Sequence, residues 1–449
     1  MTIFHRICHW LGQRTRTTIL TPTPYAVGNC AEEVYFGLLK ARREGKRLVI
    51  LFPYELPWRF KFKLTNVEVI NVVSSYRQRL PAALHIGGRL LLTAYFGFMR
   101  VVSLIRRVVL GRHLSYLYRV PSAGVTTLWQ PEHCMADFSW RIVEQYEWPK
   151  QIAMPIDVGL AEDKLRLAEK QRRALGLPDD AWFACLHVRE SGFHRDTVVE
   201  RNASIANYIS AIKEITDRGG WVVRLGDASM TPLPPLDRVI DYPFTPFKSE
   251  LMDVYLISQC RVYIGMISGI YDVAVLFQRP IILTNMTNWL WAYPPKAGDL
   301  GILKHLYSKS RGRFLSAQEW MEEPWDAIGI RAFGPDYVLH ENTPEELADV
   351  VREFFDGNGS SEIAEIKQNC NRFRIVRGVE IISRPIFAGE NPQQVKEKSI
   401  PNPFAPDDHF FDMLERYRMA SRLQSAMGSL GGAFLRQNWQ CACGEVGPR

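Results

Sequence analysis

The segment "ACLHVRESGFHRD", residues 184–196, combines a strand-like apolar run with a dense group of polar side chains. Six titratable side chains follow within ten residues: His187, Arg189, Glu190, His194, Arg195 and Asp196. Guanidinium groups bind phosphate oxygens in a bidentate manner, and carboxylates act as general bases. The segment therefore predicts an anion-binding or acid–base site at the end of a buried strand.

Two further apolar runs end in residues suited to the same chemistry. "WVVRLGD" ends with Arg224, Gly226 and Asp227, and "VYIGMISG" ends with Ser268 and Gly269. Ligands of open parallel sheets bind beyond the carboxyl ends of the strands. Backbone N–H groups at the start of a helix favour a phosphate there. We predict that these three strand ends together hold a diphosphate.

The same residues also permit a purely structural interpretation. Arg189 could pair with Glu190 or Asp196 in a solvated surface network, which contributes little to stability or function. Ser268 and Gly269 could simply begin a helix. The coincidence of suitable residues at three strand ends favours the functional interpretation.

The second half of the chain alternates strands with helices. We predict strands at 182–188, 221–225, 262–265 and 281–284, and helices at 205–216, 250–260 and 269–277. A polar stretch at 161–170 precedes them, and a helix capped by Thr343 begins at Pro344. This alternation predicts a doubly wound parallel sheet.

The first half opens with a smaller unit of the same kind. A strand at 17–20, a helix at 31–43 and a strand at 47–52 predict a parallel pair with a right-handed crossover. Residues 66–148 have a mostly helical pattern with many aromatic side chains.

The length of 449 residues favours two domains with a tail. We expect one Rossmann-like domain at 1–165 and a second at 166–345. C-terminal helices and a tail should occupy 346–449, with little order at 431–449. The fold class is thus α/β.

The composition limits the kinds of ligand and partner that this protein is expected to bind. The net charge of +7 suits anionic ligands, but the chain has no zinc-finger or RNA-recognition motif, so nucleic acid is not an expected partner. Cysteines in apolar stretches are typical of reduced core thiols, and Cys441 with Cys443 is too isolated for a zinc site. Residues 1–20 lack a secretory signal, which favours a cytoplasmic protein.

The apolar segment 90–99 is too short to span a bilayer, and it lies between Arg89 and Arg100. It fits an amphipathic core helix. It also fits an interfacial helix in peripheral contact with anionic lipid on the inner face of the cytoplasmic membrane.

Missing motifs exclude several phosphate-binding classes. The chain lacks a P-loop and a Gly-x-Gly-x-x-Gly fingerprint, and the serine of "GMISG" is one place late for a hydrolase elbow. No two Asp residues stand two positions apart, so the Asp-x-Asp metal clamp of many sugar transferases is absent. A metal-independent nucleotide-sugar transferase remains.

Two stretches carry a family resemblance: "CLHVRESGFHRDTVVERNASIANYISAIKEITDRGGWVVRLGD" and "MDVYLISQCRVYIGMISGIYDVAVLFQRPIILTN". They are similar to a bacterial family of glycosyltransferases found with surface-polysaccharide genes. More distantly they resemble fucosyltransferase-type GT-B enzymes, whose hallmark is a His-x-Arg strand end. "YAVGNCAEEVYFGLL" resembles the Gly-rich first loop of the acceptor domain, although Gly28-Asn29-Cys30 stands where relatives often carry Gly-His-x.

The resemblance implies an α/β, GT-B-like fold with an acceptor-side domain at 1–165 and a nucleotide-sugar-binding domain at 166–345. It also implies a role for each candidate residue. Arg189 would clamp the diphosphate, and His187 would shape the loop or touch the donor. Ser268 and Gly269 would hold the distal phosphate. The nucleoside would be recognised at the end of the next strand, by Arg224, Gly226 and Asp227. Asp196, Glu190 and Glu200 are candidate general bases.

The activity so implied is hexosyl or deoxyhexosyl transfer to a cell-surface glycan, a lipid-linked glycan or a protein. It would need a nucleotide-sugar donor as substrate but no cofactor and no metal. The alternatives are a nucleotide- or glycan-binding protein without turnover, and a membrane-associated scaffold that binds no nucleotide.

Overall fold

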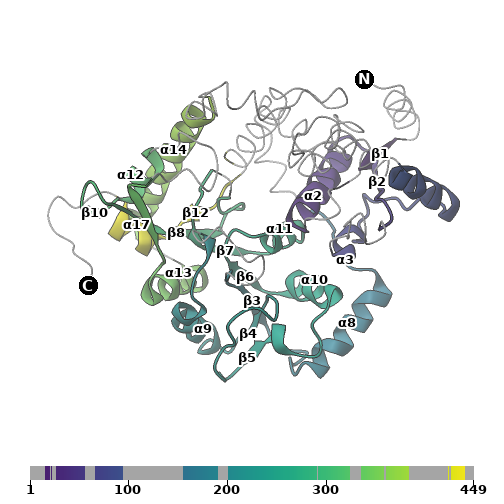
Figure 1. Ribbon diagram of the computed structural model, residues 1–449, viewed down its shortest axis with the longest axis horizontal. Helices are drawn as coiled ribbons and strands as arrows, with labels where there is room; N and C mark the ends of the chain where they lie inside the picture. Colours follow the sequence, from purple (N-terminus) through teal and green to yellow (C-terminus); the bar gives the residue numbers. More distant parts are fainter. Residues whose placement is uncertain are drawn as a thin grey trace, which may run out of the picture. The chain divides into compact units, whose positions relative to one another are not determined.

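The structure is a computed structural model that describes residues 16–20, 22, 27–55, 66–94, 155–190, 201–290, 292–323, 335–357, 360–383, 423 and 426–439. The chain divides into two compact units (Figure 1). One comprises Met1–Leu165, Val275–Gln278 and Glu397–Arg418, and the other comprises Arg166–Ala274, Arg279–Lys396 and Met419–Arg449.

The first unit contains the predicted strand–helix–strand motif. β1 (Thr17–Leu20) and β2 (Arg47–Ile50) pair in parallel, joined by α2 (Val27–Arg43). The parallel pair is confirmed. The helix begins four residues before the predicted 31, because the buried residues Gly28 and Cys30 continue its inner face. Lys40, Arg42 and Arg43 lie in its last turn, where cations are favourable for the helix dipole.

Short helices follow in the same unit. α3 (Val67–Ile70) is capped by Asn66, whose side chain accepts a hydrogen bond from the Glu68 N–H. Residues 82–94 form another helix, which contains the first half of the apolar segment predicted at 90–99. The rest of that segment lies outside the described residues. Within the described parts of the chain, no helix has the length and apolar character needed to cross a bilayer.

The second unit is built on a seven-stranded sheet with the order β12-β8-β7-β6-β3-β4-β5. Every neighbouring pair is parallel. The strands are β3 (Phe183–His187), β4 (Trp221–Arg224), β5 (Val239–Asp241), β6 (Val262–Gly265), β7 (Ile281–Met286), β8 (Leu300–Leu303) and β12 (Ser429–Leu430). The prediction of an α/β fold with a parallel sheet is confirmed.

The strand order reverses between β3 and β6. The chain builds outward from β3 through β4 to β5, then returns to the other side of β3 and builds outward from β6. In doubly wound sheets, ligands bind beyond the carboxyl ends of the two strands between which the order reverses. This reversal is the topological feature that positions a ligand in such sheets.

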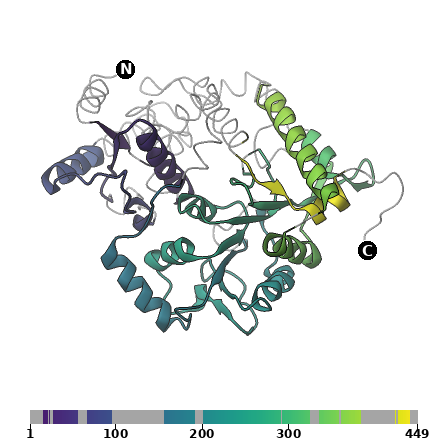
Figure 2. The same cartoon turned by 180° about the vertical axis from the view of Figure 1, so that it is seen from behind.

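Helices cover both faces of the sheet. α9 (Ile209–Thr216) and α13 (Pro344–Asp356) lie side by side on one face (Figures 1 and 2). α10 (Glu250–Gln259) and α11 (Gly269–Leu276) cover the other (Figure 2). The Thr343 side chain caps α13 in a full capping box with Glu346, as the Thr343-Pro344 pair predicts.

The polar stretch at 161–170, which we expected only as a connection, is part of helix α8 (Glu162–Ala174). Acidic residues in its first turn and basic residues in its last complement the helix dipole. Because only Ala168 of this helix is buried, its apolar stripe is too narrow to be recognised by periodicity.

The C-terminal region is more regular than predicted. α14 (Ser361–Ser383) is long, β12 adds a strand to the parallel sheet, and α17 (Gly432–Asn438) follows within the stretch for which we expected little order. The Gly432 N–H at the start of α17 donates to the Glu353 carboxylate, 2.6 Å away. This buried contact holds α17 in place, and it joins residues far apart in the sequence.

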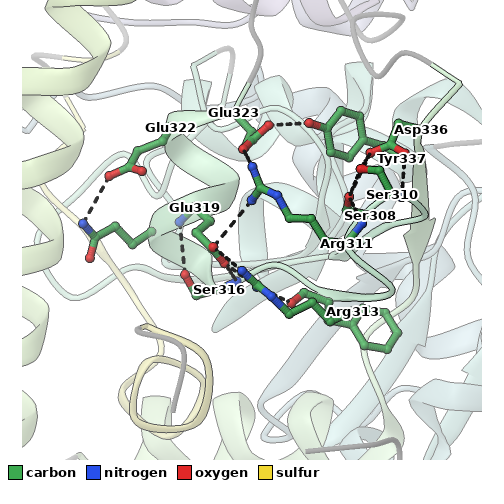
Figure 3. A network of polar contacts seen from close by, with 12 residues as sticks. Ser308, Ser310, Arg311, Arg313, Ser316, Glu319, Glu322, Glu323, Asp336 and Tyr337 are labelled. Carbon is green, nitrogen blue, oxygen red and sulfur yellow. Dashed lines mark hydrogen bonds and ion pairs between the residues drawn. The ribbon is translucent and has the colours of Figure 1, made fainter. Parts of the chain in front are cut away.

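A small antiparallel sheet, β10-β9-β11, completes this unit. It comprises β9 (His305–Ser308), β10 (Arg313–Phe314) and β11 (Tyr337–His340), and α12 (Ala317–Glu322) follows β10. Arg313 binds Glu319 through two contacts of 2.7 and 2.8 Å, and Arg311 and Tyr337 both bind Glu323 (Figure 3). Such half-exposed ion pairs fix local geometry and contribute little net stability.

Candidate functional site

The carboxyl ends of β3 and β6 meet at the point where the strand order reverses. His187, the last residue of β3, is the register partner of Gly265, the last residue of β6. A Cβ atom at Gly265 would lie 2.8 Å from the His187 carbonyl oxygen and 2.9 Å from the Tyr263 hydroxyl. A glycine is therefore required for the two strands to end so close together.

His187 links the two strand ends through its side chain. Its Nδ1 lies 3.3 Å from the Ser268 hydroxyl, in the turn that leads to α11. Burial, together with the nearby charges of Arg224, Arg189 and Lys248, lowers the pKa of His187 from 6.5 to about 4. The imidazole is consequently neutral at pH 7.

This low pKa makes stability depend on pH in a defined window. His187 becomes protonated near pH 6.5 in the unfolded chain and only near pH 4 in the folded chain. The contribution of the neutral imidazole to the free energy of unfolding is therefore complete above pH 6.5 and is lost as the pH falls to about 4. Between pH 7 and pH 4.5 the unfolding free energy of the native protein should therefore fall by about 2–3 kcal/mol more than that of His187→Asn, which has no imidazole to protonate. Urea unfolding at the two pH values measures this.

The matched control is His340→Asn, at an exposed histidine on β11. It should retain the full pH dependence of the native protein. An equal loss of stability in the native protein and in His187→Asn would contradict the prediction.

Two arginines lie beside this strand end. Arg189 follows β3 and is half-buried, which lowers its pKa. Arg201 donates from Nη2 to the Ile267 carbonyl oxygen at 2.6 Å. Burial first, and then the charge of Arg189, lowers the pKa of Arg201 to about 10. The Asp272 carboxylate acts in the opposite direction on the pKa of Arg201, so an acidic group also lies near these arginines.

The start of α11 adds backbone donors to the same edge. Gly269 is the first residue of α11, and Ser268 precedes it. Arg201 holds the turn before this helix through Ile267, so the turn, the two arginines and His187 form one cluster. Guanidinium groups and helix N-termini are the two protein elements best suited to phosphate oxygens. Diphosphate binding at this edge of the sheet stays a prediction.

The guanidinium group of Arg224 contacts other protein groups in the interior. Its side chain is fully buried, and it donates to the Thr231 carbonyl oxygen at 2.6 Å. It also pairs with Asp241 at 3.1 Å and with Glu190 at 3.2 Å. Arg224 thus fastens the loops after β3 and β4 together. A contact between Arg224 and the nucleoside stays a prediction.

Glu190 belongs to the same structural cluster. Its Oε2 accepts from Arg224 and from the Thr231 N–H at 2.7 Å. This gives Glu190 a role in holding the loop after β4, and its role as a general base stays a prediction. The other candidate bases, Asp196 and Glu200, lie outside the described residues, as do His194 and Arg195.

Gly226 and Asp227 form the turn after β4. Gly226 has a φ of +148°, and a Cβ there would lie 2.1 Å from the Met230 sulfur, so a glycine is required. The Asp227 carboxylate accepts from the Ser229 N–H at 2.8 Å, as in an Asx turn. Nucleoside recognition by this turn remains a prediction.

Arg201 is the site residue that the sequence interpretation missed. It lies within the quoted stretch, but nothing in its spacing separates it from the other charged residues there. It becomes visible only through its contact with Ile267, 66 residues away.

Among the described residues, no three His, Cys, Asp or Glu side chains gather in a group that could hold a metal ion. The Glu190 and Asp227 carboxylates each accept hydrogen bonds from protein groups. The independence of metal predicted from the sequence stays a prediction.

Comparisons with known proteins give little guidance. No family model matches the chain, and no curated protein matches it. A solved structure that is similar is that of a glycosyl transferase family 9 protein from Veillonella parvula, with 11% identity and a TM-score of 0.33. The similarity covers 59% of this chain and 79% of that chain. A likeness of this strength decides neither fold nor function, and the resemblance to fucosyltransferase-type enzymes gains no support from it.

Proposed function

We propose that this chain transfers a sugar from a nucleotide-sugar donor to a hydroxyl group of an acceptor. The observation that carries the proposal is the position of one cluster. His187, Ser268 and the two arginines lie where β3 and β6 diverge, which is where doubly wound sheets bind nucleotides.

In the proposed reaction, the acceptor oxygen forms a bond to the anomeric carbon while the bond from that carbon to the diphosphate oxygen breaks. The electron pair of the broken bond leaves with the nucleoside diphosphate. Arg189 and Arg201 would neutralise the negative charge that develops there, and the backbone donors at Gly269 would add hydrogen bonds. The acceptor proton would pass to a carboxylate base, for which Asp196, Glu190 and Glu200 are the candidates.

The neutral His187 would act as a positioning residue. Because its imidazole is uncharged at pH 7, it can exchange a hydrogen bond with Ser268 without adding to the positive charge of the site. It would thereby hold the turn before α11 at the distance that the distal phosphate needs.

The finer parts of the proposal come from the sequence resemblance. They are a GT-B-like fold with the acceptor side at 1–165, hexosyl or deoxyhexosyl transfer, and an acceptor that is a cell-surface glycan, a lipid-linked glycan or a protein.

Nucleotide binding followed by donor turnover tests the proposal. Calorimetry with GDP, UDP, dTDP and CMP should identify one preferred nucleotide, and the matching nucleotide-sugar should then be hydrolysed slowly in the absence of acceptor. Binding without hydrolysis or transfer would favour a non-catalytic binding protein. Binding of no nucleotide would overturn the proposed function and favour the scaffold interpretation.

Activity should persist without a divalent metal. The chain has no Asp-x-Asp pair, and fixed guanidinium groups with backbone N–H groups can stabilise a leaving diphosphate as a Lewis acid does. We therefore expect EDTA-treated protein to keep its transfer rate once a donor is found. Complete loss with EDTA, restored by manganese or magnesium, would instead indicate that carboxylates such as Asp227 or Asp272 bind a metal.

A further inference from the structure

The helix at 82–94 in the first unit has an unusual distribution of side chains. Its exposed residues are all apolar: Ala82, Ala83, Leu84, Ile86, Gly87, Leu90, Leu91 and Ala94. The exposed fractions of the largest of them are high: 63% for Leu84, 57% for Leu90, 50% for Leu91 and 48% for Ile86. A helix on a water-facing surface normally exposes charged and polar residues instead.

The inner side of this helix is already occupied. Leu92 is 3% exposed, and a Cβ on Gly88 would contact Leu51 at 3.1 Å. The Thr93 hydroxyl accepts a hydrogen bond from the Tyr54 N–H at 2.8 Å. The helix therefore already packs one side against its own unit, and the exposed apolar residues form a second, separate face.

The stretch of sequence that contains the helix carries charge of one sign. Arg89 stacks over the rings of Phe52 and Tyr54, at 4.2 and 3.8 Å from their centroids, and Arg79 is exposed just before the helix. From position 69 to position 131 the sequence contains no Asp or Glu. It contains eight arginines there: Arg77, Arg79, Arg89, Arg100, Arg106, Arg107, Arg112 and Arg119. A stretch this long without an acid is complementary to a negatively charged surface.

We propose that the exposed face of the helix at 82–94 docks on an anionic lipid surface. Leu84, Ile86, Leu90 and Leu91 would enter the boundary between headgroups and acyl chains, and Arg79 and Arg89 would contact the lipid phosphates. An apolar face in a stretch of chain that carries arginines and no acids suits an anionic lipid surface better than it suits a second copy of the chain, since two copies would bring their arginines together. The proposal does not depend on the enzymatic activity.

Vesicle flotation of the full-length protein tests the proposal. Phosphatidylcholine vesicles are compared with vesicles that contain about 30% phosphatidylglycerol, in about 0.05 M and about 0.5 M salt. We expect several-fold more protein on the anionic vesicles in low salt, and a clear loss in high salt because salt screens the surface charge. Equal recovery on both kinds of vesicle, or recovery on neither, would overturn the proposal.

Substitutions identify the surface responsible. Leu90→Gln combined with Leu91→Gln should lower the vesicle-bound fraction about tenfold, because two apolar side chains would no longer enter the lipid. The control is Leu167→Gln, at a 47% exposed leucine on α8, which should bind like the native protein. Thermal unfolding midpoints equal to that of the native protein would show that both variants fold.

Two other occupants of the face give different results. If a second copy covers it, the native protein should form a dimer that the Leu90→Gln, Leu91→Gln variant loses, with no vesicle binding by either. If another segment of this chain covers it, that variant should unfold at a lower temperature, again without vesicle binding. Either result would overturn the lipid assignment.

Discussion

Arg189→Lys is expected to weaken the binding of the preferred nucleoside diphosphate by about 1.5–3 kcal/mol, which is roughly a tenfold to a hundredfold rise in Kd. Lysine keeps the positive charge but loses the planar fork that contacts two phosphate oxygens at once. Arg189 is half-buried beside His187 and Arg201, where water competes poorly for those contacts. Titration calorimetry with the native protein and the variant measures the difference.

Arg261→Lys is the matched control for this experiment. Arg261 stands just before β6, at the amino edge of the same sheet, and its guanidinium stacks over the Trp182 ring at 4.7 Å. The same substitution at the opposite edge should leave the nucleotide Kd unchanged. An unchanged Kd in Arg189→Lys would show that the diphosphate does not bind at this strand end.

Arg201→Lys distinguishes the role of Arg201 from that of Arg189. Its side chain also holds Ile267 in the turn before α11, so a lysine there should both weaken phosphate binding and loosen the turn. Because the two arginines are neighbours, we expect the double variant to lose less affinity than the two single losses added together.

The second large effect is on stability. Arg224→Met should lower the free energy of unfolding by about 3–5 kcal/mol, the usual cost of removing one partner from a buried ion pair. The variant leaves the carboxylates of Glu190 and Asp241 without their shared guanidinium, and the Thr231 carbonyl oxygen without its donor. Urea unfolding of the full-length protein measures the loss as a lower urea concentration at the unfolding midpoint.

Arg238→Met provides the comparison for this substitution. The Arg238 side chain is 43% exposed, and its contact with Asp237 is long, at 3.8 Å. Its removal should change the unfolding free energy by less than about 0.5 kcal/mol. Equal midpoints for the two variants would mean that the Arg224 contacts do not hold the edge of the sheet.

Local sequence signals predicted the strands and helices that bury one continuous apolar face. Val262–Gly265 forms the predicted strand, and the α11 helix begins at Gly269 as expected, because each has its signal within a few residues. The carboxyl ends of β3, β4 and β6 lie within one residue of the prediction, since a polar residue after a buried run marks the point where the chain returns to the surface. β7 continues two residues past its predicted end, and β2 ends two residues before.

Elements with short or weak patterns could not be recognised in this way. β5 has three residues and β12 has two, and each is stabilised by its neighbour in the sheet rather than by its own composition. α8 buries only one residue, so its helical period carried almost no apolar signal.

The roles of the charged residues depended on the tertiary structure. Sequence alone placed Arg224 at a strand end as a candidate ligand contact. In the structure its side chain is fully buried and pairs with Glu190 and Asp241, which lie 34 and 17 residues away in the sequence. Arg201 carried no distinguishing signal until folding placed it beside Arg189 and Ile267. Sequence determined that this edge of the sheet would be charged, because burial patterns are local. Only the tertiary structure decided which charges pair with protein groups and which gather at the switch point, because ion pairing depends on distances between residues far apart in the chain.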